Sequence, residues 1–402
     1  MMPGVTPLWG IKVLDLSRVL AGPVCCQLLA ELGADVVKVE RPGQGDDTRA
    51  WGPPYVPDGG PSAYFASANH GKRSIAVDLS QAGGIEVLED LIRHADILVE
   101  NFLPGAAAKY GLTPERLAEL NPLLVSCSIS GYGRTGPLSD LPGYDLVIQA
   151  TSGLMAITGE PAGAPMKVGV AIADVITGLY AASSALSGLF ARIAGRGGWA
   201  FDLSLFDCTL ASLVNVAQST LVTGQRPRRY GNAHAQIVPY EVFATADGHL
   251  VLAVGNDGQW RQFCQASGIA ELGSHERFAT NPLRVQHRGE LIALLQPVMT
   301  SRKTADWQRL LEPAGVPHAA VVALDEALAE PLVAARQMVV PVRDSAGREY
   351  RVLGSPIHWH GESPRKVTAP PALGEHTDEV LREWLAYNDA RVRSLRQAGV
   401  VA

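Results

Sequence analysis

A single carboxylic acid, Asp174, stands in an otherwise small-residue and apolar stretch, 165–188 (PMKVGVAIADVITGLYAASSALSG). Residues 168–172 have the short apolar pattern of a strand, whereas apolar residues recur at helical spacing over 175–190. Asp174 is therefore expected at a strand-to-helix junction. There it could cap the helix, an interaction worth about 1 kcal/mol. It could instead be a nucleophile that the helix dipole keeps ionised and that neighbouring glycines leave open to a substrate.

The composition is typical of a folded protein with more than one domain. A chain of 402 residues is long enough for two or three domains, and its 47% apolar and 18% charged residues are usual for globular proteins. The net charge is −6 and the cations are scattered along the chain, so no nucleic-acid partner is expected.

The cysteines and the chain start bear on the cellular compartment. The cysteines are odd in number and lack C-x-x-C spacing, which favours reduced thiols in a reducing compartment. They are Cys25, Cys26, Cys127, Cys208 and Cys264. Residues 1–10 lack the basic and apolar regions of a signal peptide, and no segment reaches the roughly 18 to 20 uninterrupted apolar residues of a membrane span. We therefore expect a cytoplasmic protein with no membrane partner, and we predict no metal site.

An α/β alternation begins the chain. Residues 11–16 (IKVLDL) and 35–40 (DVVKVE) read as buried strands on either side of a helix over 24–32. This βαβ pattern favours parallel strands with a right-handed crossover. The turn between the first strand and the helix, VLAGP at 19–23, lacks the G-x-G-x-x-G fingerprint of dinucleotide-binding folds. A nicotinamide or flavin cofactor is therefore not expected.

The alternation continues after a Gly- and Pro-rich loop. Strands are predicted at 74–79, 97–100 and 123–130, and helices at 83–94 and 114–120. Ligands of open α/β sheets bind in loops beside the strand ends. Three glycine-containing loops are the candidates here: 69–73 (NHGKR), 101–105 (NFLPG) and 130–133 (SGYG).

A different module follows. A strand end and a long helix over 202–222 give way to a polar break (TGQRPRRY, 223–230), where we place a domain boundary. Beyond it we predict strands at 242–244 and 249–254 around an Asp-Gly turn, followed by helices at 258–267, 288–299 and 304–312. A strand at 350–353 and a final helix over 375–397 complete the chain. The predicted parts are 1–223, a small α+β domain with its linker at 224–330, and 331–402.

Six ordered runs resemble the signatures of family III CoA-transferases, which include formyl-CoA and carnitine CoA-transferases, with α-methylacyl-CoA racemases as relatives. They are GIKVLDLSRVLAGP (10–23), LGADVVKVERPGQGDDTR (32–49), NHGKRSIAVDL (69–79), VENFLPGAAAKYGL (99–112), SISGYGRTGP (128–137) and VGVAIADVITGLYAA (168–182). Further runs resemble the branch that exchanges CoA between succinyl-CoA and glutarate: 40–54, 152–161, 231–243 and 373–381.

The resemblance implies both a fold and a mechanism. The implied fold is α/β, with a large Rossmann-like domain built from both chain ends, a smaller α+β domain, and two subunits interlocked as a homodimer. The implied mechanism has Asp174 attack an acyl-CoA thioester to form a mixed anhydride, which the CoA thiolate converts into an aspartyl-CoA thioester; an acceptor carboxylate then completes the exchange. Such covalent catalysis divides one difficult acyl transfer into easier steps. No tightly bound cofactor is implied, since CoA and acyl-CoA are substrates.

The resemblance also implies the binding residues. The implied CoA contacts are Val19, Leu20, Arg41, Lys72, Arg73, Asn101, Phe102, Leu103, Lys109, Tyr144 and Asp145. The cations among them could pair with phosphates, although each alone could equally be a solvated surface charge. The candidates for the acceptor acid are Arg18, Arg49, His234, Gly255 and Gly258. An arginine could grip the distal carboxylate of a dicarboxylate.

Two departures from the family pattern narrow the activity. Leu20 stands where formyl-CoA transferase has a glutamine, and 255–258 (GNDG) replaces a run of glycines, which argues against oxalate or formate. Tyr144 stands where the racemases have a catalytic histidine, and a tyrosine of ordinary pKa, about 10, carries protons poorly at neutral pH. Racemase is the alternative enzyme, and a CoA-binding protein without transferase activity is the alternative from another class.

Overall fold

The computed structural model describes residues 6–359 and 367–402. The chain divides into two compact units. The first comprises the residues up to 154 together with 168–224 and 331–402, and the second comprises 155–167 and 225–330. The sequence-based parts are 1–223, 224–330 and 331–402; the two units divide after 224 and after 330, and 155–167 belongs to the second unit.

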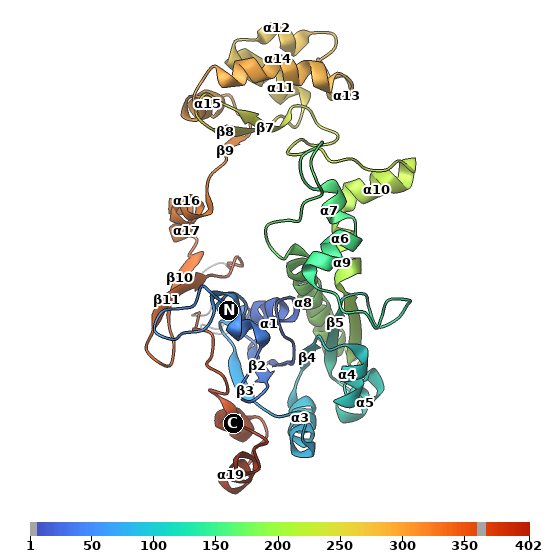
Figure 1. Ribbon diagram of the computed structural model, residues 1–402, viewed down its shortest axis with the longest axis vertical. Coiled ribbons are helices and arrows are strands. Elements are labelled where there is room, and N and C mark those ends of the chain that lie inside the picture. The colour runs from blue at the N-terminus through green and yellow to red at the C-terminus, as the bar shows by residue number, and fades with distance from the viewer. Residues whose placement is uncertain (1–5, 360–366) are drawn as a thin grey trace. The chain divides into compact units, whose positions relative to one another are not determined.

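A six-stranded parallel sheet forms the centre of the first unit (Figure 1). Its strands are β1 (Lys12–Asp15), β2 (Asp35–Glu40), β3 (Arg73–Ala76), β4 (Ile97–Glu100), β5 (Val125–Ser130) and β6 (Trp199–Ser204). The spatial order is β3-β2-β1-β4-β5-β6, with every neighbouring pair parallel. The order reverses between β1 and β4. Open sheets bind ligands beside the carboxyl ends of their strands at such a reversal.

Helices cover both faces of this sheet. Successive residues of a strand point to opposite faces, so Val13 packs into one apolar core and Leu14 into the other. The Val13 core is closed by α1 (Ala21–Glu31), α8 (Ile172–Ile193) and α9 (Leu205–Ser212). The Leu14 core is closed by α3 (Ala82–His94), α5 (Pro114–Leu120), α18 (Thr377–Glu383) and α19 (Asp389–Gln397). Both ends of the chain therefore build the first unit.

Shorter elements complete the first unit. They are η1 (Asp47–Ala50), α2 (Ala63–Asn69), α4 (Pro104–Lys109), α6 (Asp145–Thr151), α10 (Val214–Thr223), α17 (Pro331–Ala335) and the antiparallel pair β10 (Val339–Arg343) and β11 (Glu349–Leu353). The one-turn helix α7 (Leu154–Ile157) begins at the division between the units.

The second unit has its own antiparallel sheet and core. The strands are β7 (Tyr240–Ala244), β8 (His249–Ala253) and β9 (His318–Ala320). The helices are α11 (Asp257–Ser267), α12 (Ala270–Ser274), α13 (Asn281–Gln286), α14 (Arg288–Thr300), α15 (Thr304–Leu311) and α16 (Leu324–Ala329). The core contains the fully buried Trp260, Phe263 and Trp307.

Three sequence-based predictions are wrong. Residues 168–172 form no strand; the backbone N–H of Val168 donates to a side chain of α6 instead of pairing with a neighbouring strand. The single helix predicted over 375–397 is two, α18 and α19, because Asn388 caps a new helix start. The long helix predicted within 202–222 is also two helices, α9 and α10, which are bent by 79° around Leu213.

In the described part of the chain, α8 is the one helix that by itself is long and apolar enough to cross a membrane. The bent pair α9 and α10 meets that criterion only when both are taken as one span. Core helices of folded proteins meet the same criterion, and one side of α8 is buried against α1 and β5. This feature was not expected from the sequence.

Candidate active site

Asp174 is the third residue of α8 and lies in its first turn. Ala171 occupies the N-cap position, so the capping role considered for Asp174 is not the one it has. Four residues later, Gly178 lies against the start of α1: a Cβ at this position would stand 2.7 Å from the carbonyl oxygen of Ala21. A glycine is therefore needed for α1 and α8 to meet this closely beside the Asp174 carboxylate.

The start of α8 is capped by Asp145, from α6. Its Oδ1 accepts a hydrogen bond of 2.8 Å from the N–H of Ala173, and its Oδ2 accepts one of 2.8 Å from Nε2 of Gln149. Gln149 is fully buried, and its Oε1 accepts from the N–H of Val168 at 2.9 Å. Asp145 thus takes the N–H that a helix start leaves free. Both of its carboxylate oxygens have partners within the chain.

The surroundings of Asp174 favour its protonated form. Burial, and after it the negative charge of Asp145, raise the pKa of Asp174 from 3.8 to about 7. Near neutral pH Asp174 is therefore partly protonated: burial and Asp145 act against the helix dipole, which the sequence led us to expect would keep this carboxylate ionised. Tyr64 of α2 is close enough to both carboxylates to be affected by their charges. Burial first, and then the charges of Asp174 and Asp145, raise the pKa of its phenol to about 12.

A cleft of about 520 Å³ opens at the carboxyl ends of four strands. It is lined by Leu16 after β1, Arg41 after β2, Val77 after β3 and Phe102 after β4. This is the reversal of strand order at which open α/β sheets bind ligands. The cleft is partly polar and partly apolar in its lining, as a nucleotide with a base and phosphates would require.

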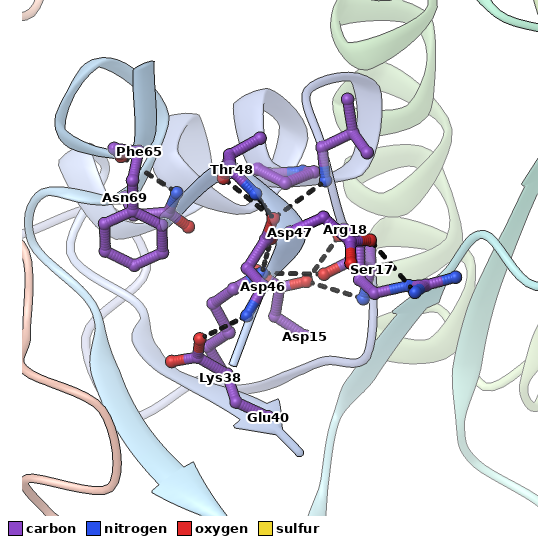
Figure 2. Close-up of polar contacts among 12 residues, drawn as sticks. Asp15, Ser17, Arg18, Lys38, Glu40, Asp46, Asp47, Thr48, Phe65 and Asn69 are labelled. Carbon is purple, nitrogen blue, oxygen red and sulfur yellow. Dashed lines mark hydrogen bonds and ion pairs between the residues drawn. The ribbon is translucent and has the colours of Figure 1, made fainter. Parts of the chain in front are cut away.

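A buried ion cluster contributes Lys38 and Asp46 to the lining of the cleft, and Figure 2 shows its contacts. Nζ of Lys38 lies 2.9 Å from Oδ2 of Asp46 and 4.0 Å from Oδ2 of Asp15, and it donates to the carbonyl oxygen of Ser17 at 2.7 Å. Burial alone would raise the pKa of Asp15, but Lys38 and Lys72 outweigh it and lower that pKa to about 2. The cluster ties the loop after β1 to the loop after β2.

Lys72 and Arg73, two of the residues implied to contact phosphate, instead bind groups within the protein. Nζ of Lys72 is buried and donates to Asp15, to the carbonyl oxygen of Pro23 and to Asn69, at 2.9, 3.0 and 3.0 Å. All three ammonium donors therefore have partners inside the protein. The guanidinium of Arg73 pairs with one carboxylate on β2, Asp35, and with two on α18, Glu379 and Glu383. A phosphate contact by either residue would require breaking these pairs.

Arg49, a candidate for binding the acceptor acid, likewise has an ion pair within the protein. Its Nε and Nη2 each donate to Glu40 at 2.7 Å, and its guanidinium lies 3.8 Å from the ring centroid of Phe65. This bidentate geometry is the one in which an arginine binds a carboxylate most strongly. The carboxylate that Arg49 grips is thus one of the protein's own.

The turn between β1 and α1 holds the other implied contacts of the first motif. Val19 has φ = 70°, the left-handed region that β-branched residues rarely adopt, and Leu20 occupies the N-cap of α1. The backbone of Arg18 exchanges two hydrogen bonds with the side chain of Asn101, at 2.9 and 2.8 Å. Nη1 of Arg18 pairs with Asp47 at 3.1 Å, and both side chains are exposed and line the cleft.

Among the remaining implied CoA contacts, Leu103, Lys109 and Tyr144 have exposed side chains. Leu103 precedes α4 and Lys109 ends it, whereas Tyr144 precedes α6. Of all the implied CoA contacts, Arg41 and Phe102 line the cleft; Nη1 of Arg41 donates to Gln44 at 2.9 Å.

The candidates His234, Gly255 and Gly258 belong to the second unit, whereas Asp174 belongs to the first. Nδ1 of His234 accepts from the N–H of Gln236 at 3.0 Å, and its ring lies 5.4 Å from that of Tyr240. Gly255 donates to Oε1 of Gln259 at 2.8 Å, and Gly258 is the second residue of α11.

Sequence reasoning missed three residues near the site: Lys38, Tyr64 and Gln149. A signal existed for Lys38, because a lysine within the strand DVVKVE, buried on both faces, needs a paired carboxylate. No such signal marks Tyr64 or Gln149, whose neighbours come from distant parts of the chain. In the ranges 6–359 and 367–402, no group of three His, Cys, Asp or Glu residues is placed to hold a metal ion.

Comparison with known proteins identifies the class. The profile of CoA-transferase family III matches residues 8–377. A succinate–glutarate CoA-transferase of Agrobacterium fabrum is 44% identical, covering 94% of this chain and 95% of the relative. The succinyl-CoA:glutarate CoA-transferase of Homo sapiens is 40% identical, covering 100% of this chain and 91% of the relative.

A solved structure agrees with this assignment. The crystal structure of a CaiB/BaiF family protein from Brucella suis has a TM-score of 0.82 and 42% sequence identity, with 94% of this chain and 99% of the other covered. The chain belongs to CoA-transferase family III. The family predicted from the sequence motifs, and with it an enzyme that transfers CoA, is confirmed.

Proposed function

We propose that the protein transfers CoA from succinyl-CoA to glutarate, with Asp174 as the nucleophile. The proposal is supported by the names of relatives that are 44% and 40% identical over nearly the whole chain. The structural observation that carries it is the Asp174 carboxylate. It is partly buried at the start of α8, beside the close contact of α8 with α1.

The reaction proceeds in four balanced steps. The Asp174 carboxylate attacks the succinyl carbonyl and expels CoA thiolate, giving an aspartyl–succinyl anhydride. The thiolate attacks the aspartyl carbonyl, giving an aspartyl-CoA thioester and releasing succinate. Glutarate attacks that thioester and again expels thiolate, and the thiolate then takes the glutaryl group and frees Asp174. No acyl group passes to water if the site excludes it, so the thioester energy is kept.

CoA is proposed to bind the cleft at the carboxyl ends of the strands. Arg18 and Arg41 on its rim are exposed cations that could pair with the nucleotide phosphates, and the aromatic ring of Phe102 provides apolar surface. Lys72 and Arg73 act instead as supports of the loops, as their internal ion pairs indicate.

The test is mass spectrometry after incubation with succinyl-CoA and hydroxylamine, together with an assay for glutaryl-CoA. A hydroxamate on the peptide that contains Asp174, absent from Asp174→Ala, and new glutaryl-CoA are expected. An unmodified peptide and no new thioester would contradict the proposal. Deuterium exchange at the α-carbon of a 2-methylacyl-CoA, without an acceptor, would favour the racemase alternative.

A homodimer of interlocked subunits is also proposed. Helices α8 and α10 expose Phe190, Ile193, Leu221 and Val222, each at least 73% exposed, and monomers rarely leave so much apolar surface in water. Sedimentation should show a dimer at micromolar concentration. Interlocked chains cannot separate while folded, so tagged and untagged dimers mixed under native conditions should not exchange subunits; free exchange would contradict interlocking.

A cytoplasmic location is proposed from the thiols. The five cysteines are free and buried. Reduced cysteines are usual in reducing compartments. Fractionation of cells with an antibody to the protein should place it in the cytoplasmic fraction, and its recovery elsewhere would contradict this.

A further inference from the structure

Two residues of α6, Gln149 and Asp145, contact the segment before Asp174. Gln149 is fully buried, and its carbonyl oxygen accepts from the N–H of Val168 while its amide nitrogen donates to Asp145 at 2.8 Å and to the carbonyl oxygen of Val170 at 3.4 Å. Asp145 in turn accepts from the N–H of Ala173, the residue before Asp174. The loop and the first helical turn are therefore fixed at three points by two residues of α6.

The chemistry of this contact requires a glutamine beside a carboxylate. The N–H of Val168 can only donate, and an ionised Asp145 can only accept. The side chain between them must therefore accept on one side and donate on the other, which an amide does in a single orientation. A glutamate at this position could not donate to Asp145. An apolar residue would leave the N–H of Val168 without this partner.

We propose that Gln149 and Asp145 are positioning residues: the Gln149 amide orients the Asp145 carboxylate, and together they hold the start of α8 so that the Asp174 carboxylate meets the thioester carbonyl. The inference rests on the proposed nucleophilic role of Asp174. It gives Asp145 a function different from the CoA contact that the family resemblance implies. Neither Asp145 nor Gln149 lines the cleft.

A reciprocal exchange of the two side-chain types tests the hydrogen-bond pattern. In Asp145→Asn, the new amide nitrogen faces the Gln149 amide nitrogen, and turning Gln149 over places a donor against the Val168 N–H. In Gln149→Glu, two carboxylates face one another. The double variant Asp145→Asn/Gln149→Glu restores a donor opposite an acceptor at the contacts with Val168 and Ala173 and between residues 145 and 149, and it loses only the 3.4 Å contact with the carbonyl oxygen of Val170. Asp140→Asn, which changes an exposed carboxylate ahead of α6, is the matched control.

Three quantities are measured in each variant: the single-turnover rate of Asp174 acylation by succinyl-CoA, trapped with hydroxylamine; amide hydrogen exchange in the peptide around 168–175; and the Kd for CoA. At pH 8.5, where Asp174 is largely ionised with or without the charge of Asp145, we expect each single variant to acylate about ten- to a hundredfold more slowly, since small misplacements of a reacting group cost this much. Exchange in the peptide should rise about tenfold. The double variant should return to within about threefold of the wild-type rate. The Kd for CoA should remain unchanged in all.

Each outcome decides the inference. Single variants that acylate as fast as wild type would overturn it, and so would a double variant no faster than the slower single variant. A weaker Kd for CoA in Asp145→Asn with unchanged acylation would return Asp145 to a CoA contact and overturn it as well. A wild type that forms no Asp174 hydroxamate would defeat the proposed function, and the positioning role with it. That result is distinct from the others, in which wild type reacts.

Discussion

Replacing the proposed nucleophile should make the protein more stable. In wild type the pKa of Asp174 rises from 3.8 to about 7 on folding, first because of burial and second because of Asp145. A shift of about three pH units corresponds to about 4 kcal/mol when the group is fully ionised, at about 1.36 kcal/mol per unit. Asp174 is only partly buried, and solvent screening reduces the figure to about 2 kcal/mol. Asp174→Asn keeps the shape and removes the charge.

The pH dependence has a definite sign. Below about pH 4 the carboxyl is protonated in both the folded and unfolded chain, so the variant gains nothing. Between about pH 4 and pH 7 the unfolded chain has released the proton while the folded chain retains it, so the free energy of unfolding of wild type falls relative to that of the variant. Above about pH 7 the difference is constant.

Calorimetry at pH 5, 6, 7 and 8 measures this difference. At pH 8 the variant should melt about 3 °C higher than wild type, and at pH 5 the gap should be smaller by more than half. Asp140→Asn, which removes an exposed carboxylate, should melt with wild type at every pH. A variant that melts at or below the wild-type temperature at pH 8, or a gap that does not change with pH, would refute the reasoning.

Three further outcomes are expected. The single-turnover acylation rate should rise about tenfold from pH 6 to pH 8, because only ionised Asp174 with a pKa of about 7 can attack; a flat profile in rapid-quench experiments would contradict this. Lys72→Met should lower the free energy of unfolding by about 3–5 kcal/mol in urea titrations, because Asp15 loses a buried partner; unchanged stability with weaker CoA binding would restore the phosphate role. Arg41→Ala should weaken CoA binding about tenfold by calorimetry and change stability by less than about 0.5 kcal/mol, since Arg41 is exposed beside the cleft; an unchanged Kd would exclude it from the site.

Local patterns predicted most of the sheet. The bounds of β2 and β4 agree with the predicted ranges 35–40 and 97–100, because short stretches rich in Val, Ile and Leu that end at a glutamate are typical of buried strands. Residues 168–172 have a similar apolar pattern and form no strand, because the backbone finds its partner in a side chain of α6, distant in sequence. Patterns along the chain cannot reveal such a partner.

The sequence predicted less of the site than of the fold. The change of period placed Asp174 at a strand-to-helix junction, whereas the structure has no strand there and places it in the first turn of α8. Its raised pKa depends first on burial and then on Asp145, which is 29 residues away in sequence. Lys72 and Arg41 look alike in the sequence, as cations in loops near strand ends. The difference between them is burial: Lys72 is 3% exposed and Arg41 is open to solvent. Only the three-dimensional arrangement separates a support from a ligand contact.

The buried ion cluster at the cleft has a consequence for how CoA binding responds to salt. Lys38, Lys72 and Arg49 balance Asp15, Asp46 and Glu40, so the cluster carries no net charge, and these side chains are buried or nearly so. Mobile ions screen buried pairs poorly and exposed charges well. The shape of the cleft should therefore persist at high ionic strength, while the attraction of Arg18 and Arg41 for a phosphate fades. Added salt would then lower the affinity for CoA only by weakening the attraction between these arginines and the phosphates. The binding surface itself would stay unchanged.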